Sequence, residues 1–306
     1  MNTKKVIVIG GPTAVGKSLL AIKLAKYLNT EIISADSRQF YKELFIGVNK
    51  PSKFELKEVK HHLIGHISIK KNYSVGQFEK EALEKITEKF KKINTLILCG
   101  GSGLYIDAVC EGLHKFPKVS QKIKNEIYNT YQKKGLEYLQ EELKNNDEES
   151  FKKIDIQNPH RVMRVLSIFR ASQIPYSNFI KNEKVKRDFN ISYISLTMPR
   201  DKLYSRIDQR VNKMLEDGLI NEVKSLYKFK NKSALKTIGY KEIFSHLDKK
   251  ISIQEAVNEI KKNSRRYAKR QITWFSRKKY TQIQMDELKI DKTINNIIGN
   301  NLINEK

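Results

Sequence analysis

KVIVIGGPTAVGKS, residues 5–18, is the segment most informative about the fold of this 306-residue chain. Its apolar first half predicts a buried β-strand, and its second half fits the phosphate-binding pattern G-x-x-x-x-G-K-[ST] without a mismatch. In such a loop backbone N–H groups converge on the phosphates, the start of the next helix and Lys17 add positive charge, and Ser18 is placed to hold Mg²⁺. The pattern therefore predicts a nucleotide-binding type of loop that holds a diphosphate or triphosphate through Gly11, Pro12, Thr13, Ala14, Val15, Gly16, Lys17 and Ser18.

The rest of the chain alternates strand and helix patterns. Helices are expected at residues 19–28, 74–92 and 200–216, and further strands at residues 31–35, 61–69, 95–99 and 191–197. From about residue 116 to 190 glycine nearly vanishes and the apolar period is helical. We predict an α/β fold with a P-loop NTPase-like core, in which helices flank a parallel sheet, and an inserted helical domain; the core is residues 1–115 and 191–306, and the insertion is residues 116–190.

Positive charge is in large excess. The chain has 59 Lys and Arg against 34 Asp and Glu, a formal net charge of +25, and residues 261–280 hold nine basic residues and no acidic one. Such an excess favours a polyanionic partner, most often nucleic acid, over a surface that is merely rich in lysine. A helix through this segment is expected to turn its apolar residues to a core and its charges to another face; these are Ile260, Tyr267, Ile272 and Phe275 on the one side and Lys262, Arg265, Arg266 and Lys269 on the other.

Cysteine use and hydropathy indicate the compartment. Cys99 and Cys110 lie in apolar stretches, which predicts buried, reduced thiols and neither a disulfide framework nor a zinc site. The first strand begins by Lys5, leaving no room for a signal peptide, and no apolar run approaches the ~20 residues of a membrane span. We therefore expect a cytoplasmic protein that is not bound to a membrane.

Asp36 is the carboxylate that follows an early strand. It stands at the expected carboxyl end of residues 31–35, the edge of a parallel sheet where ligands bind. The strand at residues 95–99 ends in glycine and carries no acidic residue to position Mg²⁺ and water for hydrolysis. This pair of features disfavours a motor or switch NTPase and favours a kinase-like or transferase use of the loop.

Further motifs occur in a defined order along the chain. Together they resemble the tRNA dimethylallyltransferases, also called tRNA isopentenyltransferases, over about residues 5–280, and the lack of a C-terminal Cys/His cluster resembles the bacterial type. The motifs are GPTAVGKS at 11–18, SADSRQFYKELFIG at 34–47, HHLI at 61–64, YSVGQF at 73–78, GGSGLY at 100–105, NPHRVMR at 158–164, LYSRIDQRVNKMLEDGLINEV at 203–223, TIGYKE at 237–242 and RRYAKRQITWF at 265–275.

The resemblance implies a prenyl transfer. Such enzymes move a dimethylallyl group from dimethylallyl diphosphate to N6 of the adenine at tRNA position 37, next to the anticodon, and release diphosphate. The loop would then hold the isoprenoid diphosphate with Mg²⁺ as cofactor. The partners implied are dimethylallyl diphosphate and a tRNA anticodon stem-loop, and the implied oligomeric state is a monomer.

The resemblance also assigns catalytic residues. Asp36 is expected to accept the N6 proton as the C–N bond forms, although an N-cap or a Mg²⁺ ligand is an alternative for the same carboxylate. Ser18 with Mg²⁺ and Arg210 are expected at the departing diphosphate. Arg206 is a rival to Arg210, and an ion pair on the helix surface with Asp208 or Glu216 is the alternative role of Arg210.

The expected tRNA contacts include a flipped adenine read on its edge. His160 has an alternative role as a helix-start residue, and Tyr240 as a core aromatic. Departures from the family pattern at Val48, Asn49 and Gly65 concern local loop contacts. By resemblance the tRNA-binding residues are Asp36, Ser37, Arg38, Gln39, Ser102, Lys124, His160, Arg161, Val162, Met163, Arg164, Lys236, Thr237, Ile238, Gly239, Tyr240, Lys241, Arg265 and Arg270.

Two other functions are compatible with the P-loop. One is transfer or phosphorylation on a small acceptor, as in an adenylate isopentenyltransferase or a nucleoside kinase; the basic tail and the inserted domain argue against a small acceptor. The other is an RNA-binding ATPase, against which the missing carboxylate after residues 95–99 argues.

Overall fold

The computed structural model describes residues 3–180, 185–286 and 289–299. The chain divides into two compact units, Met1–Glu111 with Arg187–Lys306, and Gly112–Lys186. We call the first the core unit and the second the inserted unit. The expected insertion at residues 116–190 begins and ends four residues later than the unit that the structure has.

The core unit is built on a six-stranded sheet whose strands all pair in parallel, in the order β3-β2-β4-β1-β5-β6. The parallel α/β fold is thereby confirmed. Every residue of β1 is buried, as expected of a strand with neighbours on both edges and helices on both faces. The strands are β1 (Lys5–Gly10), β2 (Ile32–Ser34), β3 (His61–His62), β4 (Thr95–Cys99), β5 (Asn190–Thr197) and β6 (Thr281–Gln284).

The strand expected over residues 61–69 is wrong beyond His62. Only His61 and His62 pair with β2, and Ile67 makes an isolated bridge to Tyr41. The reason lies in the backbone, because Leu63 and Gly65 have φ angles of 58° and 57°, which an extended strand cannot hold.

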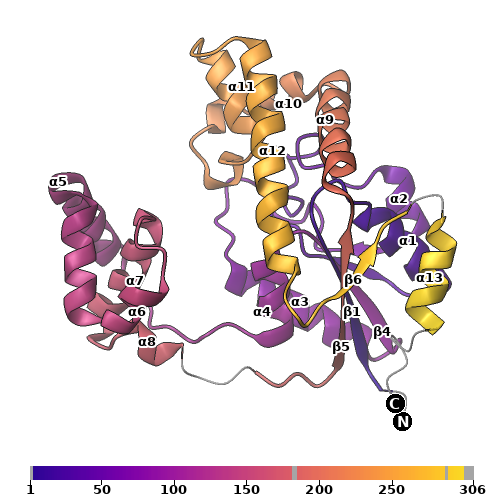
Figure 1. Ribbon diagram of the computed structural model, residues 1–306, viewed down its shortest axis with the longest axis horizontal. Helices are drawn as coiled ribbons and strands as arrows, with labels where there is room; N and C mark the ends of the chain where they lie inside the picture. Colours follow the sequence, from indigo (N-terminus) through magenta and orange to yellow (C-terminus); the bar gives the residue numbers. More distant parts are fainter. Residues whose placement is uncertain (1–2, 181–184, 287–288, 300–306) are drawn as a thin grey trace. The chain divides into compact units, whose positions relative to one another are not determined.

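Helices cover both faces of the sheet (Figure 1). Ile7 and Ile9 of β1 face the side of α1, α9 and α13, whereas Val6 and Val8 face α3 and α4. This alternation follows from the two-residue period of a strand. The helices of these two layers are α1 (Lys17–Tyr27), α2 (Lys53–Glu58), α3 (Val75–Lys89), α4 (Gly103–Glu111), α9 (Arg200–Glu216) and α13 (Ile290–Gly299).

A group of helices stands beyond the end of the sheet at which β5 runs into α9 (Figure 1). Its own core contains Val211, Leu219, Tyr240, Ile243 and Ile260. This group lies over the carboxyl edge of the strands, which is where a parallel sheet binds ligands. With α9 it comprises α10 (Leu219–Ser225), the 3-10 turns η1 (Tyr227–Phe229) and η2 (Ser233–Leu235), α11 (Tyr240–Leu247) and α12 (Ile253–Phe275).

Helix α12 corrects one detail of the expected apolar face. Ile260 and Phe275 are buried as expected, but Ile272 is 41% exposed. The inward stripe instead runs through Ala268, Gln271 and Phe275 at helical spacing, which leaves Ile272 one residue off it.

The inserted unit is helical, as the sequence predicts, and packs around its own cluster of Ile127, Leu139, Leu143, Val162 and Leu166. Gly135 takes φ 81° inside α5 and breaks that helix in two. The helices of the unit are α5 (Gln121–Asn146), α6 (Glu148–Lys153), α7 (Pro159–Ser172) and α8 (Tyr176–Phe179).

Both cysteines are free, with Cys110 buried and Cys99 half-buried. Within residues 3–180, 185–286 and 289–299, none of the helices combines the length and the apolar character needed to cross a bilayer.

Candidate active site

The P-loop joins β1 to α1 in the backbone form that its glycines permit. Gly11 and Gly16 take φ angles of 137° and 105°, and a Cβ on Gly11 would lie 2.8 Å from the carbonyl oxygen of Leu196. Helix α1 begins directly after Gly16, so its free N–H groups open into the loop. The loop thus has the form of an anion cradle.

Lys17 lies folded against this loop. Its ammonium donates to the carbonyl oxygens of Gly11 at 3.0 Å and Pro12 at 2.7 Å. Burial lowers the pKa of Lys17 to about 8, and nearby Arg210 also lowers it, while Cys99 and Asp36 act in the opposite direction. The charged form of such a buried ammonium is stabilised when an anion binds beside it.

Two helices from the far half of the chain hold the outer side of the loop. From α9, Arg210 Nη1 donates to Thr13 Oγ1 at 2.9 Å, and Arg206 Nε donates to the Ala14 carbonyl at 2.8 Å. From α12, Gln271 Oε1 accepts the Thr13 N–H at 2.8 Å. The two arginines that the sequence could not rank therefore bind different loop residues.

Of Arg206 and Arg210, it is Arg210 that borders the main cavity. Its expected surface alternative is not what the structure has, because Asp208 pairs instead with Arg265 of α12, at 2.6 and 2.8 Å. Burial, followed by the charge of Arg206, holds the pKa of Arg210 below its ordinary value. Two close cations at the loop favour a strongly anionic ligand.

The main cavity has a volume of about 350 Å³ and lies beside the loop. Its lining combines the charged side chains of Asp36, Arg38 and Arg210 with an apolar wall on α9 that contains Ile207 and Met214. The cavity is therefore fitted to a ligand with an anionic end and an apolar part. Its remaining lining residues are Thr13, Ser37, Gly47, Val48, Asn49, Val211, Lys236, Thr237, Ile238, Gly239, Lys241, Ile260, Ser264, Tyr267 and Arg270.

Asp36 follows β2 and caps a turn rather than a helix. Its Oδ1 accepts the Arg38 N–H at 2.9 Å, and the next amide, Ser37 N–H, donates to Ser102 Oγ at 3.0 Å. The N-cap alternative for Asp36 is thus excluded, since no described helix begins here. The turn leaves the carboxylate on the border of the main cavity.

Arg38 and Gln39 already bind protein carbonyls. Arg38 Nη1 donates to Ser233 and Ala234, each at 3.3 Å, and Gln39 Nε2 donates to Asn49 at 2.9 Å. These bonds connect the turn after β2 to η2 on one side and to the loop at Asn49 on the other. Direct base contacts by these two side chains stay predictions.

A smaller cavity of about 50 Å³ lies on the other side of Asp36. Ser18, Ser34 and Asp36 present hard oxygen atoms to it, with Lys17 alongside. Among the residues that the structure describes, no three His, Cys, Asp or Glu side chains group as a metal cage. Mg²⁺ prefers oxygen ligands and commonly keeps several waters besides one or two side chains and substrate phosphates, so these residues fit it.

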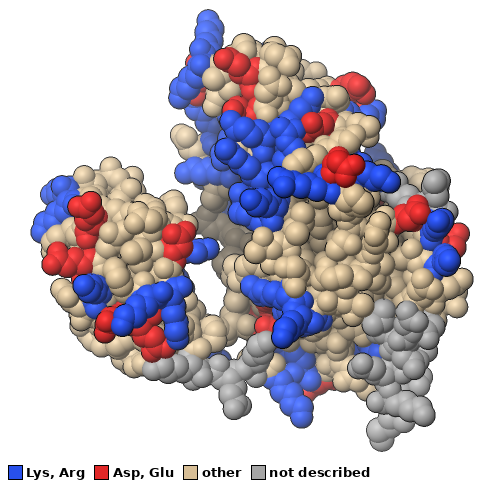
Figure 2. Space-filling view, in the orientation of Figure 1, with Lys and Arg blue, Asp and Glu red and all other residues tan. Residues whose placement is uncertain are grey.

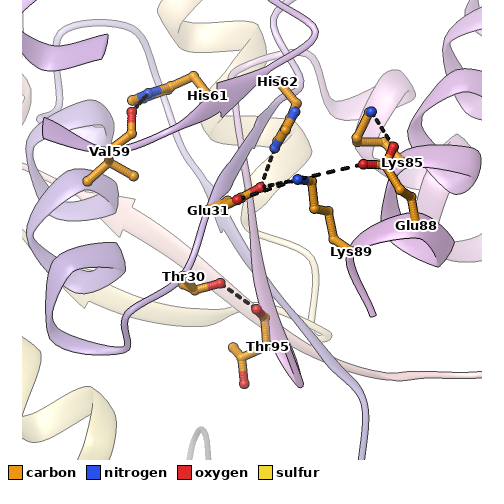
Figure 3. A network of polar contacts seen from close by, with 9 residues as sticks. All are labelled: Thr30, Glu31, Val59, His61, His62, Lys85, Glu88, Lys89 and Thr95. Carbon is orange, nitrogen blue, oxygen red and sulfur yellow. Dashed lines mark hydrogen bonds and ion pairs between the residues drawn. The ribbon is translucent and has the colours of Figure 1, made fainter. Parts of the chain in front are cut away.

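The HHLI motif begins beside this small cavity and also secures the edge of the sheet (Figure 3). His61 Nδ1 donates to the Val59 carbonyl at 2.8 Å, and His62 Nε2 contacts Glu31 at 2.5 Å. Lys89 of α3 also pairs with Glu31, at 3.1 Å. The motif therefore has a structural role in joining β3, β2 and α3.

The segment of residues 236–241 contributes every residue except Tyr240 to the lining of the main cavity, and the RNA contact expected of Tyr240 is wrong. Tyr240 has 0% exposure, and its hydroxyl donates to Glu222 at 2.5 Å. Its ring fills the space above Gly47, where a Cβ would lie 2.5 Å from it. Tyr240, the first residue of α11, is a core aromatic, because it lies in the same buried cluster as Leu219 and Val223 of α10.

The expected RNA contacts in the inserted unit lie on two helices. Lys124, His160, Arg161 and Arg164 are exposed. Val162 is corrected, since its side chain has 0% exposure and faces the core of this unit; Met163 is half-buried. His160 also stands at the start of α7, where its N–H donates to Asn158 Oδ1 at 3.1 Å.

Figure 2 shows Lys and Arg side chains gathered over α12. Arg266, Lys269 and Arg270 are exposed there, whereas Arg265 is neutralised by Asp208. A surface with several cations close together is typical of a site for a phosphate backbone.

Sequence reasoning missed two polar residues that shape the site, the buried Gln271 and the half-buried Glu222. Glu222 accepts the N–H groups of Phe45, Ile46 and Gly47 besides the Tyr240 hydroxyl, and so holds the loop that borders the cavity. Gln271 was visible as a polar residue in the apolar stripe of α12. Glu222 follows an ordinary surface pattern and gave no such signal.

A cradle for phosphate, a carboxylate beside it and a basic helix at the cavity define a P-loop α/β protein of the group-transfer class. The IPP transferase family model matches residues 39–279. The chain belongs to this family, which confirms the resemblance that the motifs carry.

Curated relatives agree with this assignment. The chain is 47% identical over 285 residues to a tRNA dimethylallyltransferase of Flavobacterium johnsoniae, covering 91% of this chain and 92% of that one. It is 48% identical over 265 residues to one of Christiangramia forsetii, covering 87% and 88%.

Solved structures are similar over nearly the whole chain. The full-length tRNA isopentenylpyrophosphate transferase of Bacillus halodurans has a TM-score of 0.71 at 36% identity, and the match covers 97% of this chain and 96% of that one. A eukaryotic dimethylallyltransferase acting on tRNA has a TM-score of 0.83 at 26% identity, covering 98% of this chain and 80% of that one.

Proposed function

We propose that this protein transfers the dimethylallyl group of dimethylallyl diphosphate to N6 of the adenine at position 37 of tRNA. The observation that carries the proposal is the cavity of about 350 Å³ that brings the P-loop residue Thr13, the Asp36 carboxylate and the Arg210 guanidinium together. Family membership and the tRNA dimethylallyltransferases among the relatives support the same reaction.

The diphosphate is proposed to lie in the P-loop. Backbone N–H groups at the start of α1 and the ammonium of Lys17 are the donors available to it. Because no carboxylate ends β4, nothing there is arranged to direct water at a terminal phosphate. The loop then serves to hold a leaving group.

In the transfer step, a bond forms between N6 of adenine and C1 of the dimethylallyl group, and the bond between C1 and the bridging oxygen breaks. The electron pair of the broken bond leaves with the diphosphate. Arg210 and Lys17 are placed to stabilise that growing negative charge. Asp36 is proposed to accept the proton that N6 loses.

The apolar wall is proposed to receive the five-carbon chain. Ile207, Val211 and Met214 of α9 border the cavity close to the arginine that contacts Thr13. Burying an apolar chain against them removes hydrocarbon surface from water at about 25 cal/mol per Å². This arrangement would favour an isoprenoid diphosphate over inorganic diphosphate.

Ser18, with Asp36 as a second oxygen ligand, is proposed to hold Mg²⁺ at the small cavity. The chemistry that the ion supplies when bound is neutralisation of charge on the diphosphate oxygens. If Asp36 serves both as ligand and as proton acceptor, its two oxygens divide the roles.

The RNA is proposed to bind by its phosphates to the basic residues over α12 and at the rim of the cavity. Lys236, Lys241 and Arg270 border the cavity itself, so they are placed to meet a nucleotide whose base has been flipped into it. The exposed cations of α5 and α7 are proposed as further contacts of the inserted unit. The cytoplasmic location, expected from cysteine use and hydropathy, and the monomeric state, expected from the resemblance, stay predictions.

The deciding experiment incubates the protein with dimethylallyl diphosphate and either unmodified tRNA or AMP, followed by mass analysis of the nucleosides. The expected result is an adenosine heavier by one dimethylallyl group, only in the tRNA sample and only when an adenosine stands at position 37. Modification of AMP alone would show a small-molecule transferase. RNA-stimulated hydrolysis of ATP without prenyl transfer would show an ATPase.

A further inference from the structure

Gln271 is a buried amide whose partners are all supplied by the active-site loops. It lies on the inward stripe of α12 and is 5% exposed. A buried amide is costly unless its oxygen accepts and its nitrogen donates a hydrogen bond. Both requirements are met here, by groups that are far away in the sequence.

The two bonds of Gln271 join two separate loops. Its Oε1 accepts the Thr13 N–H at 2.8 Å, and its Nε2 donates to the Gly101 carbonyl at 2.8 Å. The orientation of the amide is defined by these partners, because a backbone N–H can only donate and a carbonyl can only accept. Gln271 therefore bridges the P-loop and the glycine turn after β4.

Each of these loops leads directly to a proposed catalytic group. Thr13 is the residue whose hydroxyl binds Arg210. The turn packs on the strand end before Asp36, since a Cβ on Gly100 would lie 2.3 Å from the Ala35 carbonyl oxygen. A Cβ on Gly101 would lie 2.3 Å from Gln271 Nε2, so the amide packs against this turn too closely for any side chain at residue 101.

The same helix turn that carries Gln271 also carries exposed cations. Lys269 and Arg270 precede it directly and point to solvent. The inward amide and the outward cations therefore move as one rigid element, because they belong to neighbouring residues of a continuous α-helix. The position of α12 and the backbone conformation of the P-loop are therefore linked through the Gln271 side chain.

We propose that Gln271 is a positioning residue that holds the P-loop and the glycine turn in register on α12. This inference rests on the transfer reaction proposed above, although its first test does not. Without the amide, the Thr13 N–H and the Gly101 carbonyl lose their hydrogen-bond partner. The P-loop and the glycine turn that carry these two groups are then expected to rearrange. The anion cradle then loses affinity while the rest of the fold persists.

The test compares Gln271→Met with Gln254→Met, the same change at an exposed position of the same helix. Binding of inorganic pyrophosphate is measured by titration calorimetry without RNA. Loss of the two hydrogen bonds of this amide, one buried and one partly buried, is expected to weaken binding by about ten-fold or more in Gln271→Met. The control is expected to lose less than about two-fold. Equal affinities in the two variants would overturn the proposal.

A second readout separates positioning from general destabilisation. RNA binding by fluorescence anisotropy is expected to stay within about two-fold of the parent protein in Gln271→Met, since the cations of α12 are unchanged. Equal losses of RNA and pyrophosphate binding would show that the helix as a whole is disturbed and would contradict a positioning role.

A double-mutant cycle with Gly101→Ala covers the case in which Gln271→Met fails to fold. Gly101→Ala alone forces the Gln271 amide away, whereas in Gly101→Ala with Gln271→Ala the added methyl group meets no amide. The double variant is expected to bind pyrophosphate no more weakly than Gln271→Ala alone, which is strong non-additivity. Additive losses would refute the contact.

These outcomes are distinguishable from failure of the proposed function. If the parent protein binds pyrophosphate but transfers no dimethylallyl group to tRNA, the reaction is wrong and the role of Gln271 in the cradle stands. If transfer occurs and Gln271→Met retains full pyrophosphate affinity and turnover, the reaction stands and the inference on Gln271 fails.

Discussion

Glu222→Ala is expected to detach the loop that forms one side of the active-site cavity. The Glu222 carboxylate accepts the N–H groups of Phe45 at 3.1 Å, Ile46 at 2.7 Å and Gly47 at 3.1 Å, and the hydroxyl of Tyr240 at 2.5 Å. These four bonds hold backbone and side chain from three separate segments. Because Gly47 borders the cavity, the same change reaches the site.

The magnitude follows from the partners that lose their acceptor. A hydrogen bond to a charged group contributes about 1.5–3 kcal/mol, and a buried donor left without a partner costs about 1–3 kcal/mol. The Phe45 amide lies near solvent and is expected to find water, whereas the Tyr240 hydroxyl and the other two amides are partly buried. We therefore expect the free energy of unfolding to fall by about 3–5 kcal/mol.

The assay is urea denaturation followed by the fluorescence of Trp274, the single tryptophan, which belongs to the core unit. Glu216→Ala is the matched control, because it removes an exposed carboxylate from α9; its effect is expected to stay within about 0.5 kcal/mol. Tyr240→Phe removes one of the four bonds and is expected to cost about 1.5–3 kcal/mol. If Glu222→Ala loses less than about 1 kcal/mol, the loop is not held by this carboxylate.

Three further predictions concern the site. Asp36→Asn is expected to lower kcat by about 10²- to 10⁴-fold in a tRNA prenylation assay while RNA affinity changes little, and turnover near the parent rate would show that Asp36 is not the base. Burial lowers the pKa of Lys17 to about 8, so dimethylallyl diphosphate is expected to bind more weakly as pH rises above about 8, where the free protein loses the ammonium. Because phosphate esters complete their ionisation near pH 6, calorimetry from about pH 7 to 9.5 reports on titration of the protein and not of the ligand. An affinity that does not change over this range would contradict the lowered pKa. Raising salt from 50 to 200 mM is expected to weaken tRNA binding steeply and dimethylallyl diphosphate binding much less, with a shallower salt slope for Arg270→Ala; equal slopes for RNA in the two proteins would remove Arg270 from the phosphate contacts.

Features within one short segment were predictable from the sequence. The P-loop is eight consecutive residues whose glycines and lysine act on the same ligand, so its function is legible without knowledge of the fold. Strand and helix periods likewise gave the parallel core and the helical insertion. The strand at residues 61–69 failed where Leu63 adopted a positive φ, a local choice that its apolar side chain did not signal.

Contacts between distant segments were not predictable. Thr13 and Gln271 are 258 residues apart, and Phe45 and Glu222 are 177 apart. Periodicity shows that a helix face is inward but not which group lies opposite, so the expected RNA contact of Tyr240 and the ranking of Arg206 against Arg210 required coordinates.

The phosphate cradle, the α/β alternation and the basic character of α12 could be read from the amino-acid sequence, because each depends on residues that are neighbours along the chain. The side chains that complete the cradle and shape the cavity became known from the packing of distant segments. Arg210, Gln271 and Glu222 acquire their roles from the packing of α9, α10 and α12 over the carboxyl edge of the sheet, where buried polar groups must find partners that local sequence does not provide.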